Sequence, residues 1–383
     1  MATERTSFFN GLNELRALAA LCVLVPHVEQ FKSLFGLRGH VFNPLAIHIG
    51  QLAVTFFFVL SGFLITYRVL LEKEEHGTVN LRFFYARRVL RIWPLYLLLF
   101  FLAFFIFPQL DFLRPGEDIM PLSTVPFTMV PSEDFMASML LYLFMLPNVA
   151  WILGLTVPYF LHTWAIGVEE QFYCIWPAVL KRFELGIRTF AAALALIFGV
   201  IFISWAVRNF HSENAGALHR TADLLFQYMR RGRFDSFIIG AMGSYALLAQ
   251  NEWFLSILCN RYLRYCAYLL TPVFLATGAG IPYFTHTAYA VLFMIIIINV
   301  SRTRIKVPVM DYLGRLSYGI YMYHILAIGL CGAIIRPLGL KDGVLLNIAV
   351  YSSVICMTIA LSAISYHLME KRFLSMKHRF SRL

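Results

Sequence analysis

Charged residues are scarce in this chain. Only 14% of its 383 residues are charged, whereas 60% are hydrophobic. No stretch between the apolar runs is long enough for a separate soluble domain, and the chain has no low-complexity tract and no repeat of fixed period. These absences leave one integral membrane domain over residues 1–383 as the predicted organisation.

Cysteine patterns are also lacking. The six cysteines form no CxxC and no Cys/His pattern, so neither a disulfide framework nor a zinc site is indicated, and we expect no metal. The first ten residues contain no basic cluster, and no small-residue cleavage site follows them. We therefore expect no removable signal peptide. The cysteines lie mostly within apolar segments, at Cys22, Cys174, Cys259, Cys266, Cys331 and Cys356.

Apolar runs of about 18 residues recur from end to end, as membrane-spanning helices require. We predict an all-α polytopic membrane bundle of about ten transmembrane helices. The predicted spans are residues 12–31, 46–68, 92–107, 164–180, 189–207, 234–249, 265–280, 286–300, 317–335 and 344–367.

One further apolar run is interrupted. Residues 136–153 contain Pro147 and Asn148, and a full crossing there would place five downstream basic residues outside. We interpret the run as a re-entrant or interfacial segment buried against protein, where a broken helix is tolerated.

The net charge of +11 has a topological explanation. Its basic residues sit at the ends of spans rather than on a soluble face, so nucleic acid is not an expected partner. With ten crossings both termini are cytoplasmic, and most of the 32 Lys and Arg residues then lie inside, as the positive-inside rule favours. The largest outer loops are expected at about 108–135 and at about 208–232. The first contains the acidic residues Asp111, Glu117 and Asp118, and the second ends in a basic cluster at residues 230–233.

The first span carries two ionisable groups. Arg16 and His27 are eleven residues apart, which amounts to three helical turns plus roughly 20° and about 16 Å along the axis. Both therefore project from one face, with a cation near one membrane surface and a titratable ring inside. A packing histidine and a basic flank are the alternatives to a functional pair.

Three arginines precede the third span. Arg87 and Arg91 share a helical face, with Arg88 beside them and aromatic residues that can lie in the interface. An anchor attracted to anionic lipid is one interpretation. A phosphate clamp for a nucleotide-bearing cofactor is the other, because guanidinium groups bind phosphate in a bidentate manner.

Two further spans carry small or acidic residues. Ser61 and Gly62 stand among bulky side chains, and we interpret both as packing residues that let helices approach closely. Glu169 and Glu170 lie at membrane depth with His162 near the outer end of their span. They are either a structural ion pair with an arginine or part of an acid/base set.

Taken in order, these motifs resemble the integral membrane acyltransferase family 3. The resemblance covers residues 11–372, and its last motif is YHLMEKR, which contains Glu370. The ordered segments are LRALAALCVLVPH, FFFVLSGFLI, FYARRVLRIWP, WAIGVEEQFY, RFDSFIIG and LGRLSYGIYMYH.

The resemblance implies an O-acyltransferase of the inner membrane. Such proteins take an acyl group, often acetyl, from cytoplasmic acyl-CoA and deliver it to hydroxyls of carbohydrates such as lipopolysaccharide, exopolysaccharide or peptidoglycan. It makes His27 the general base and Arg16 its partner. Glu169 falls on the family's membrane carboxylate, and the residues associated with the acyl donor are Arg87, Arg88 and Arg91. Lesser motifs contain Arg233, Ser317, Tyr318, His324 and Glu370.

The chain departs from the family pattern at two positions. Ala165 and Ile166 follow Trp164 where many members have Ser-Leu, so a role for that serine hydroxyl is absent, and Arg372 stands where a proline is common. Some relatives carry an extracytoplasmic hydrolase-like domain, which we do not expect in a chain that ends in a basic tail at Leu383.

The expected chemistry has alternatives. Direct transfer and a transient acyl-enzyme are both compatible with the residues, and Pro26 frees the Cys22 carbonyl, which could orient His27. The rival function is a transporter or flippase for a lipid-linked sugar, although transporters commonly show related halves and none is visible. A sensor or scaffold is disfavoured by the many intramembrane ionisable groups.

Overall fold

The computed structural model is predominantly helical, and no strand occurs among the residues it describes. The described residues are 9, 11–32, 38–39, 44–113, 133–184, 186–210, 216–249, 252–281, 283–303, 305–340 and 343–380. The protein is an all-α membrane helix bundle, as the composition and the apolar runs predict.

Each of the ten predicted spans coincides with a helix. These helices are α1 (Leu12–Phe31), α2 (Pro44–His76), α3 (Leu81–Phe101), α6 (Trp164–Arg182), α7 (Ile187–Phe210), α9 (Phe234–Leu248), α11 (Arg261–Thr277), α12 (Thr285–Ser301), α14 (Ser317–Ile335) and α15 (Val344–Ser365). The remaining helices are α4 (Phe135–Leu143), α5 (Pro147–Ile152), α8 (Gly216–Gly232), α10 (Glu252–Leu258), α13 (Pro308–Arg315) and α16 (Lys371–Ser375).

Five helical stretches of the described residues are long and apolar enough to cross a membrane. They are Leu45–His76, Leu81–Gln109, Ile187–Asn209, Ser317–Leu338 and Val344–Phe380. The count of ten crossings therefore stays a prediction. Helix α1 is not among the five because it carries charged residues at both ends, and it is packed between α2, α13 and α14 instead of facing lipid all round.

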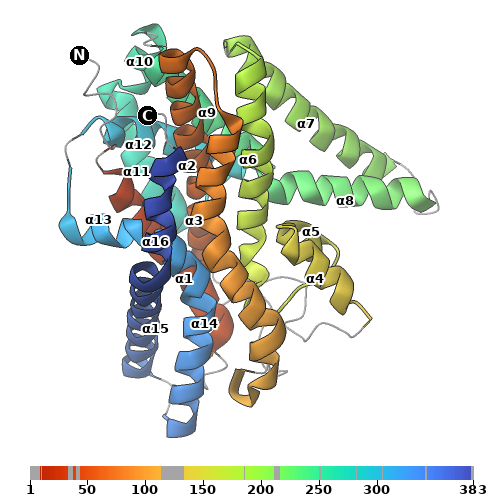
Figure 1. Cartoon of the computed structure of the whole chain (residues 1–383), viewed down its shortest axis with the longest axis vertical. Coiled ribbons are helices and arrows are strands. Elements are labelled where there is room, and N and C mark those ends of the chain that lie inside the picture. The colour runs from red at the N-terminus through yellow and green to blue at the C-terminus, as the bar shows by residue number, and fades with distance from the viewer. Residues whose placement is uncertain are drawn as a thin grey trace.

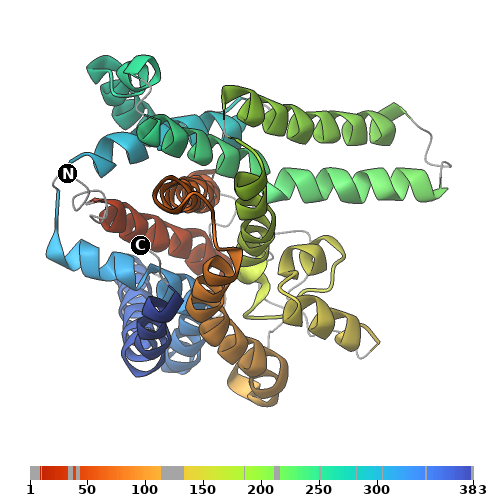
Figure 2. The same ribbon diagram turned by 45° about the horizontal axis from the view of Figure 1, so that its top comes forward.

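Helix α2 runs through the middle of the bundle. It packs against α9, α12 and α6 on one side and against α1 on the other, and α1 in turn contacts α14 and α15 (Figures 1 and 2). The close crossing of α2 and α9 depends on two glycines. A Cβ atom at Gly62 would lie 2.0 Å from the Phe237 carbonyl oxygen, and one at Gly240 would lie 2.0 Å from that of Val59. The packing interpretation of Gly62 is confirmed.

The interrupted run at 136–153 forms two short helices. Helix α4 ends at Leu143, and α5 begins at Pro147, where a proline is tolerated because the first helical N–H groups have no partner within the helix. The interruption is confirmed. Its re-entrant or interfacial placement stays a prediction.

Residues 208–232 are not a loop as predicted, because residues 216–232 form helix α8. Helix α8 buries Ala222 and Phe226, which are four residues apart, and exposes Leu218, Leu224 and Leu225. Polar residues stand between these apolar ones, so the segment lacks the long apolar run that identified the spans. Helices α7 and α8 project together from the rest of the bundle (Figures 1 and 2), linked by an ion pair of 3.1 Å between Arg208 and Asp223.

In the other predicted loop, at about 108–135, Glu117 and Asp118 lie outside the described residues, and Asp111 lies in a short 3-10 turn.

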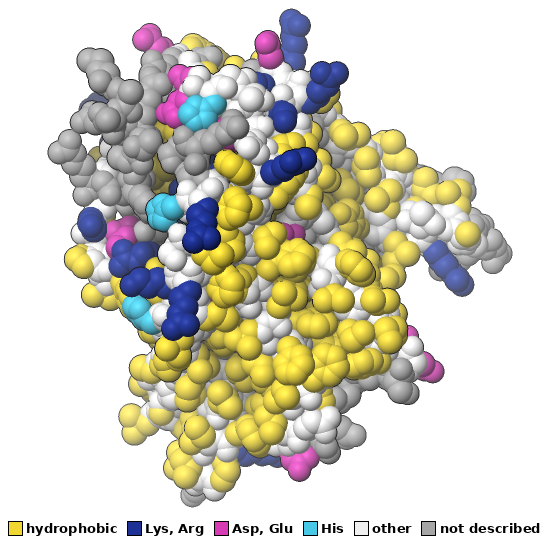
Figure 3. All heavy atoms as spheres, in the orientation of Figure 1, with side chains coloured by type: hydrophobic (Ala, Val, Ile, Leu, Met, Phe, Trp, Pro, Cys, Tyr) yellow, Lys and Arg dark blue, Asp and Glu magenta, His cyan; other side chains and the backbone are white. Residues whose placement is uncertain are grey.

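Several segments that are distant in sequence meet at one end of the bundle. The Asn13 side chain donates to Asp311 at 2.8 Å, Glu14 accepts from the Val307 N–H at 3.0 Å, and Arg87 at the start of α3 donates to the Phe380 carbonyl. Figure 3 shows hydrophobic side chains over most of the central and lower part of one face, with Lys and Arg gathered mostly along its upper and left parts.

Candidate active site

Two cavities inside the bundle contain most of the predicted site residues. The larger, of about 630 Å³, lies between α1, α2, α3, α6 and α14 and is closed partly by the C-terminal segment. Of the predicted site residues, it is lined by Arg16, Arg87, Arg88, Arg91, Glu169, Ser317 and Tyr318. The smaller, of about 180 Å³, is lined by residues that include His27, His162, Arg233, Trp151 and Trp164.

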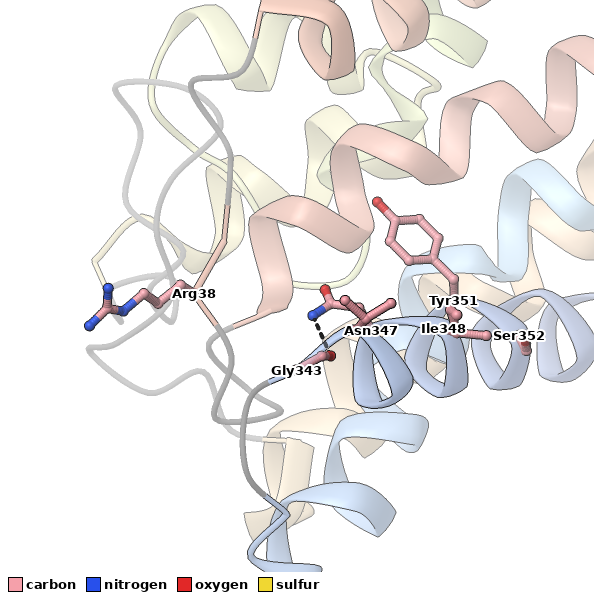
Figure 4. Close-up of a pocket in the computed structure, with 7 residues that line it drawn as sticks. Arg38, Gly343, Asn347, Ile348, Tyr351 and Ser352 are labelled. Carbon is pink, nitrogen blue, oxygen red and sulfur yellow. Dashed lines mark hydrogen bonds between the residues drawn. The ribbon is translucent and has the colours of Figure 1, made fainter.

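A third pocket, of about 870 Å³, lies at the start of α15 and is more open. Figure 4 shows Arg38 on one side of it and Asn347, Ile348, Tyr351 and Ser352 on the other, with the Asn347 amide donating to the Gly343 carbonyl at 3.0 Å. None of the predicted site residues is among the described residues that line it. The predicted site residues therefore point to the two internal cavities.

Arg87 is already engaged in the structure. It forms an ion pair of 3.3 Å with Glu72, whose side chain is almost fully buried, and it donates to the carbonyl of Phe380 at 2.5 Å. Glu72 also accepts from the N–H of Asn80 at 2.8 Å. Arg87 thus joins the end of α2, the start of α3 and the C-terminal segment, which gives it a structural function in addition to its place in the larger cavity.

Arg88 and Arg16 retain free hydrogen-bonding capacity. The Nε atom of each is buried and has no partner among the described residues. The Arg88 guanidinium lies 5.2 Å from the centre of the Tyr173 ring and 5.4 Å from that of Phe84, so the two rings hold its plane. Buried guanidinium N–H groups without partners can donate to an anionic ligand in the larger cavity.

The larger cavity contains basic residues that we did not predict as site residues. Arg68 near the end of α2, and Lys377 and His378 in the C-terminal segment, line it together with Arg88 and Arg91. The available signal was weak: Arg68 stands at the end of an apolar run, and Lys377 belongs to a basic tail that resembles a topological flank. The cavity is consequently more basic than the arginine motif alone indicates.

Glu169 is held by two hydroxyl groups. Ser61 donates to its Oε1 at 2.9 Å and Tyr173 to its Oε2 at 3.0 Å. No described cation lies within ion-pair distance of it, so the structure contains no direct ion pair of Glu169 with an arginine, although Arg16 lines the same cavity. The interpretation of Ser61 as a packing residue missed this hydrogen bond.

His27 is oriented by a side chain one turn further along α1. Its Nδ1 lies 3.2 Å from Oε1 of Gln30, so Nδ1 carries the proton and Nε2 carries the lone pair. The predicted orientation by the Cys22 carbonyl is not what the structure contains. Pro26 instead packs on α2, where a Cβ atom at Gly50 would lie 2.3 Å from the proline ring.

Two more histidines stand beside His27. The His324 ring centre is 5.0 Å from that of His27 and 4.9 Å from that of His162. His324 Nδ1 bonds the Tyr321 carbonyl at 2.6 Å, and His162 Nε2 bonds the Met322 carbonyl at 3.2 Å, which leaves the other nitrogen of each ring buried and unpartnered. Among the described residues, no group of three such side chains is placed to hold a metal ion.

Arg233 reaches the cavity of His27 from the start of α9. Its backbone is left-handed, with a φ of 47°, a conformation that costs free energy in a residue other than glycine. Its Nη1 donates to the Gln51 carbonyl at 2.7 Å and to the Thr55 hydroxyl at 3.1 Å, while its Nε has no partner. The neighbouring Arg231 stacks on Trp151, at 4.2 Å from the ring centre. The basic cluster at 230–233 therefore includes side chains at the smaller cavity.

The two cavities meet at Val54 and Tyr321, which line both. The Tyr321 hydroxyl donates to the carbonyl of His162, which fixes the ring at the boundary. Arg16 lines only the larger cavity and His27 only the smaller one. The sequence implied that Arg16 is the partner of His27, but the two side chains of α1 serve different cavities.

Two residues of the weaker motifs, Tyr318 and Glu370, make hydrogen bonds within the bundle. Tyr318 donates to the Ile92 carbonyl at 2.7 Å and ties α14 to α3. Glu370 accepts from the Ser365 hydroxyl at 3.1 Å, and neither it nor Glu170 lines the two cavities. These contacts point to helix packing for Tyr318 and Glu370.

Comparisons with known proteins agree on the class of protein. A 24% identical protein of Staphylococcus aureus (strain COL), named "Putative O-acetyltransferase", aligns over 226 residues, which is 55% of this chain and 32% of the relative. The peptidoglycan O-acetyltransferase OatA of Listeria monocytogenes is 27% identical over 199 residues, 51% of this chain and 28% of the relative. A Haemophilus influenzae protein without an assigned function is 29% identical over 231 residues, 56% of this chain and 82% of the relative.

The matched part of the chain corresponds to about a third of the length of the first two relatives. No solved structure matches. The family model described as "Acyltransferase domain" matches residues 9–367, nearly the whole chain and all of the site residues except Glu370 and the C-terminal basic residues. The chain therefore belongs to this acyltransferase family.

Proposed function

We propose that the protein transfers an acyl group, typically acetyl, from acyl-CoA in the larger cavity to a hydroxyl of a cell-surface or exported carbohydrate in the smaller cavity. The observation that carries this proposal is the division of the site at Val54 and Tyr321. The unpartnered Nε atoms of Arg16 and Arg88 lie on one side, and a histidine whose Nε2 has no hydrogen bond to a described residue lies on the other. The names of the relatives point to acetyl transfer, and one of them names peptidoglycan.

In this proposal the larger cavity is the donor site. Arg88, Arg91 and Lys377 hold the phosphates of acyl-CoA, which enters from the cytoplasmic side of the inner membrane. Arg16 supplies a further N–H donor, and the carboxylate of Glu169, fixed by Ser61 and Tyr173, sets the charge balance among these cations. Together they hold the thioester in line with the boundary between the cavities.

His27 is the general base of the transfer. Its Nε2 takes the proton of the acceptor hydroxyl while the hydroxyl oxygen bonds to the thioester carbon. The carbon–sulfur bond then breaks, the electron pair leaves with the sulfur, and His27 returns the proton to the thiolate. The hydrogen bond to Gln30 keeps Nδ1 protonated throughout, so that Nε2 is the nitrogen that cycles.

The test separates an enzyme from a carrier. Purified full-length protein in lipid nanodiscs, incubated with acetyl-CoA and a membrane extract as acceptor, should release free thiol in proportion to protein. His27→Ala should accumulate in the membrane and release none, whereas the matched variant His367→Ala, at an exposed position bonded to Tyr312, should behave like the wild type. Acyl transfer at the wild-type rate in His27→Ala would remove His27 from the mechanism.

The transporter remains the competing proposal. A flippase for a lipid-linked sugar would use the same buried charges without consuming acyl-CoA. If purified protein releases no thiol but moves a labelled lipid-linked sugar across a vesicle membrane, the acyltransferase proposal fails. Mass spectrometry of surface glycans from cells with and without the protein would identify the acceptor by a missing acyl increment.

A further inference from the structure

The smaller cavity contains an unusual set of unpartnered polar atoms. Arg233 Nε and Trp151 Nε1 are N–H donors, and His162 Nδ1 is an acceptor because His162 donates through Nε2. All three atoms are buried and have no partner among the described residues, and all three side chains line this one cavity. Arg233 and His162 are each more than nine-tenths buried. Such atoms are rare in native proteins and indicate that something else bonds them.

Aromatic side chains form one wall of the same cavity. The Trp151 and Trp164 ring centres are 5.1 Å apart, with the ring planes inclined by 43°. Arg231 lies 4.2 Å from the Trp151 ring centre, and Arg233 lies 5.7 Å from that of Trp164. The wall therefore offers flat apolar area to a ligand, while the polar atoms around it select a ligand that has both hydroxyl donors and oxygen acceptors.

The interrupted segment at 136–153 places Trp151 in this wall. The Asn148 and Gln171 side-chain amides bond each other twice, at 3.1 and 3.0 Å, which locks α5 to α6. Gly167 makes the contact possible, because a Cβ atom there would lie 2.7 Å from the Asn148 oxygen. The broken helix, which the acyl-transfer chemistry does not use, thus has a function in building the cavity.

The size of the cavity limits its occupant. At about 180 Å³ it is smaller than the typical range of about 300–1,000 Å³ for pockets that enclose whole small-molecule ligands. A single sugar ring combines the required features: an apolar C–H face for a tryptophan, hydroxyl groups that both donate and accept, and a ring oxygen that accepts. A chain of sugars would have to continue outside it.

We propose that this cavity is the subsite for one sugar ring of the acceptor. The ring stacks on the face of Trp164, Arg233 Nε and Trp151 Nε1 donate to its oxygens, and one of its hydroxyls donates to His162 Nδ1. Another hydroxyl, the one to be acylated, then donates to Nε2 of His27, which lines the same cavity. This assignment rests on the proposed function, since it takes the acceptor to be a carbohydrate.

The test measures sugar binding without the acyl donor. Full-length protein in nanodiscs of phosphatidylethanolamine and phosphatidylglycerol, free of glycolipid, is mixed with the methyl β-glycosides of glucose, galactose and N-acetylglucosamine, and saturation-transfer NMR reports binding. We expect at least one glycoside to bind through its ring C–H protons. Trp151→Phe, which keeps the ring but removes the N–H, should weaken that binding several-fold, and Trp151→Ala should abolish it.

The control is Trp253→Phe, because Trp253 on α10 is 73% exposed and does not line the smaller cavity. Thermal unfolding of each variant shows whether it is folded, and Trp151→Phe remains informative if Trp151→Ala is not. The subsite is overturned if none of the glycosides binds, if glycerol binds equally well, or if Trp151→Phe binds like the wild type. Thiol release from acetyl-CoA is measured on the same preparation, so that loss of the subsite and loss of the acyltransferase function give different results.

Discussion

Ser61 on α2 donates a hydrogen bond of 2.9 Å to Glu169 on α6, and Tyr173, one turn along α6, donates to the other oxygen of the same carboxylate. The carboxylate is thus fixed between two helices that also line the larger cavity. A carboxyl group with two hydroxyl donors is oriented, whereas a carboxyl group paired with a mobile cation would not be held in this way. The function of Glu169 therefore depends on Ser61 as well as on its own charge.

Glu169→Gln should fold normally and lose turnover. The substitution keeps the shape but removes the charge that balances the cavity arginines, so we expect at least a tenfold fall in turnover per folded molecule, or about 1.4 kcal/mol. Ser61→Ala should lose less, because Tyr173 still holds the carboxylate. The measurement is turnover and thermal midpoint in detergent on one preparation, with the exposed Glu252→Gln as control. A lowered midpoint with normal turnover would make Glu169 a structural residue only.

Substitution by lysine should have different effects at two positions of the arginine motif. Arg88→Lys should raise the KM for acetyl-CoA several-fold with little loss of stability, since Arg88 has an unpartnered Nε and no described carboxylate partner. Arg87→Lys should lower stability, by about 1–3 kcal/mol, because Arg87 bonds Glu72 and the Phe380 carbonyl. Arg82→Lys, at an exposed position of the same helix, is the control. Normal donor saturation in Arg88→Lys would favour the lipid-anchor interpretation of the motif.

The sequence predicted the helices better than it predicted the contacts between them. Ten apolar runs coincided with ten helices because a run of apolar residues is a property of one segment. Ser61 and Glu169 are 108 positions apart, and Lys377 lines the larger cavity together with residues of α1, α2 and α3, so no local pattern encodes either arrangement. Helix α8 was missed because its single apolar face is narrow. The family resemblance implied that Arg16 and His27 act as partners, and their spacing put both on one face of a helix. Neither says anything about Tyr321 and Val54, which lie between their cavities.

The membrane topology can be tested by cysteine labelling. In a background without the six native cysteines, we expect positions 75 and 305 to be labelled from the cytoplasmic side and positions 118 and 215 from the outside. The contact of Glu14 with the Val307 N–H places the segment at 305–307 next to the start of α1, which agrees with a common side for both. Positions 118 and 215 lie outside the described residues. Labelling of 305 from the outside would mean that a span was miscounted or that 136–153 crosses fully.

Gln30 should be a positioning residue for His27. Gln30→Leu removes the acceptor that keeps the proton on Nδ1, so the other tautomer becomes accessible and Nε2 is free less often. We expect turnover to fall roughly tenfold, or by about 1.4 kcal/mol, while the KM for acetyl-CoA stays unchanged because Gln30 lines only the smaller cavity. Gln30→Glu, which restores an acceptor, should recover part of the turnover. A parallel rise in the donor KM would point to general disruption instead, and Gln227→Leu on α8 controls for the loss of a glutamine.

Val54 should limit the length of the acyl group. Val54 is apolar and lines both cavities. Together with Tyr321 it forms the boundary that the acyl carbon must reach. Val54→Ala removes two methyl groups at this boundary, and one methylene in an apolar pocket changes discrimination by about 1–3 kcal/mol. We therefore expect the ratio of kcat/KM for butyryl-CoA over acetyl-CoA to rise about tenfold or more. Val350→Ala, at a buried position of α15 that lines neither cavity, should leave the ratio unchanged. If Val54→Ala slows both donors equally, the acyl group does not pass this boundary, and the two cavities do not cooperate in the way that the proposed transfer requires.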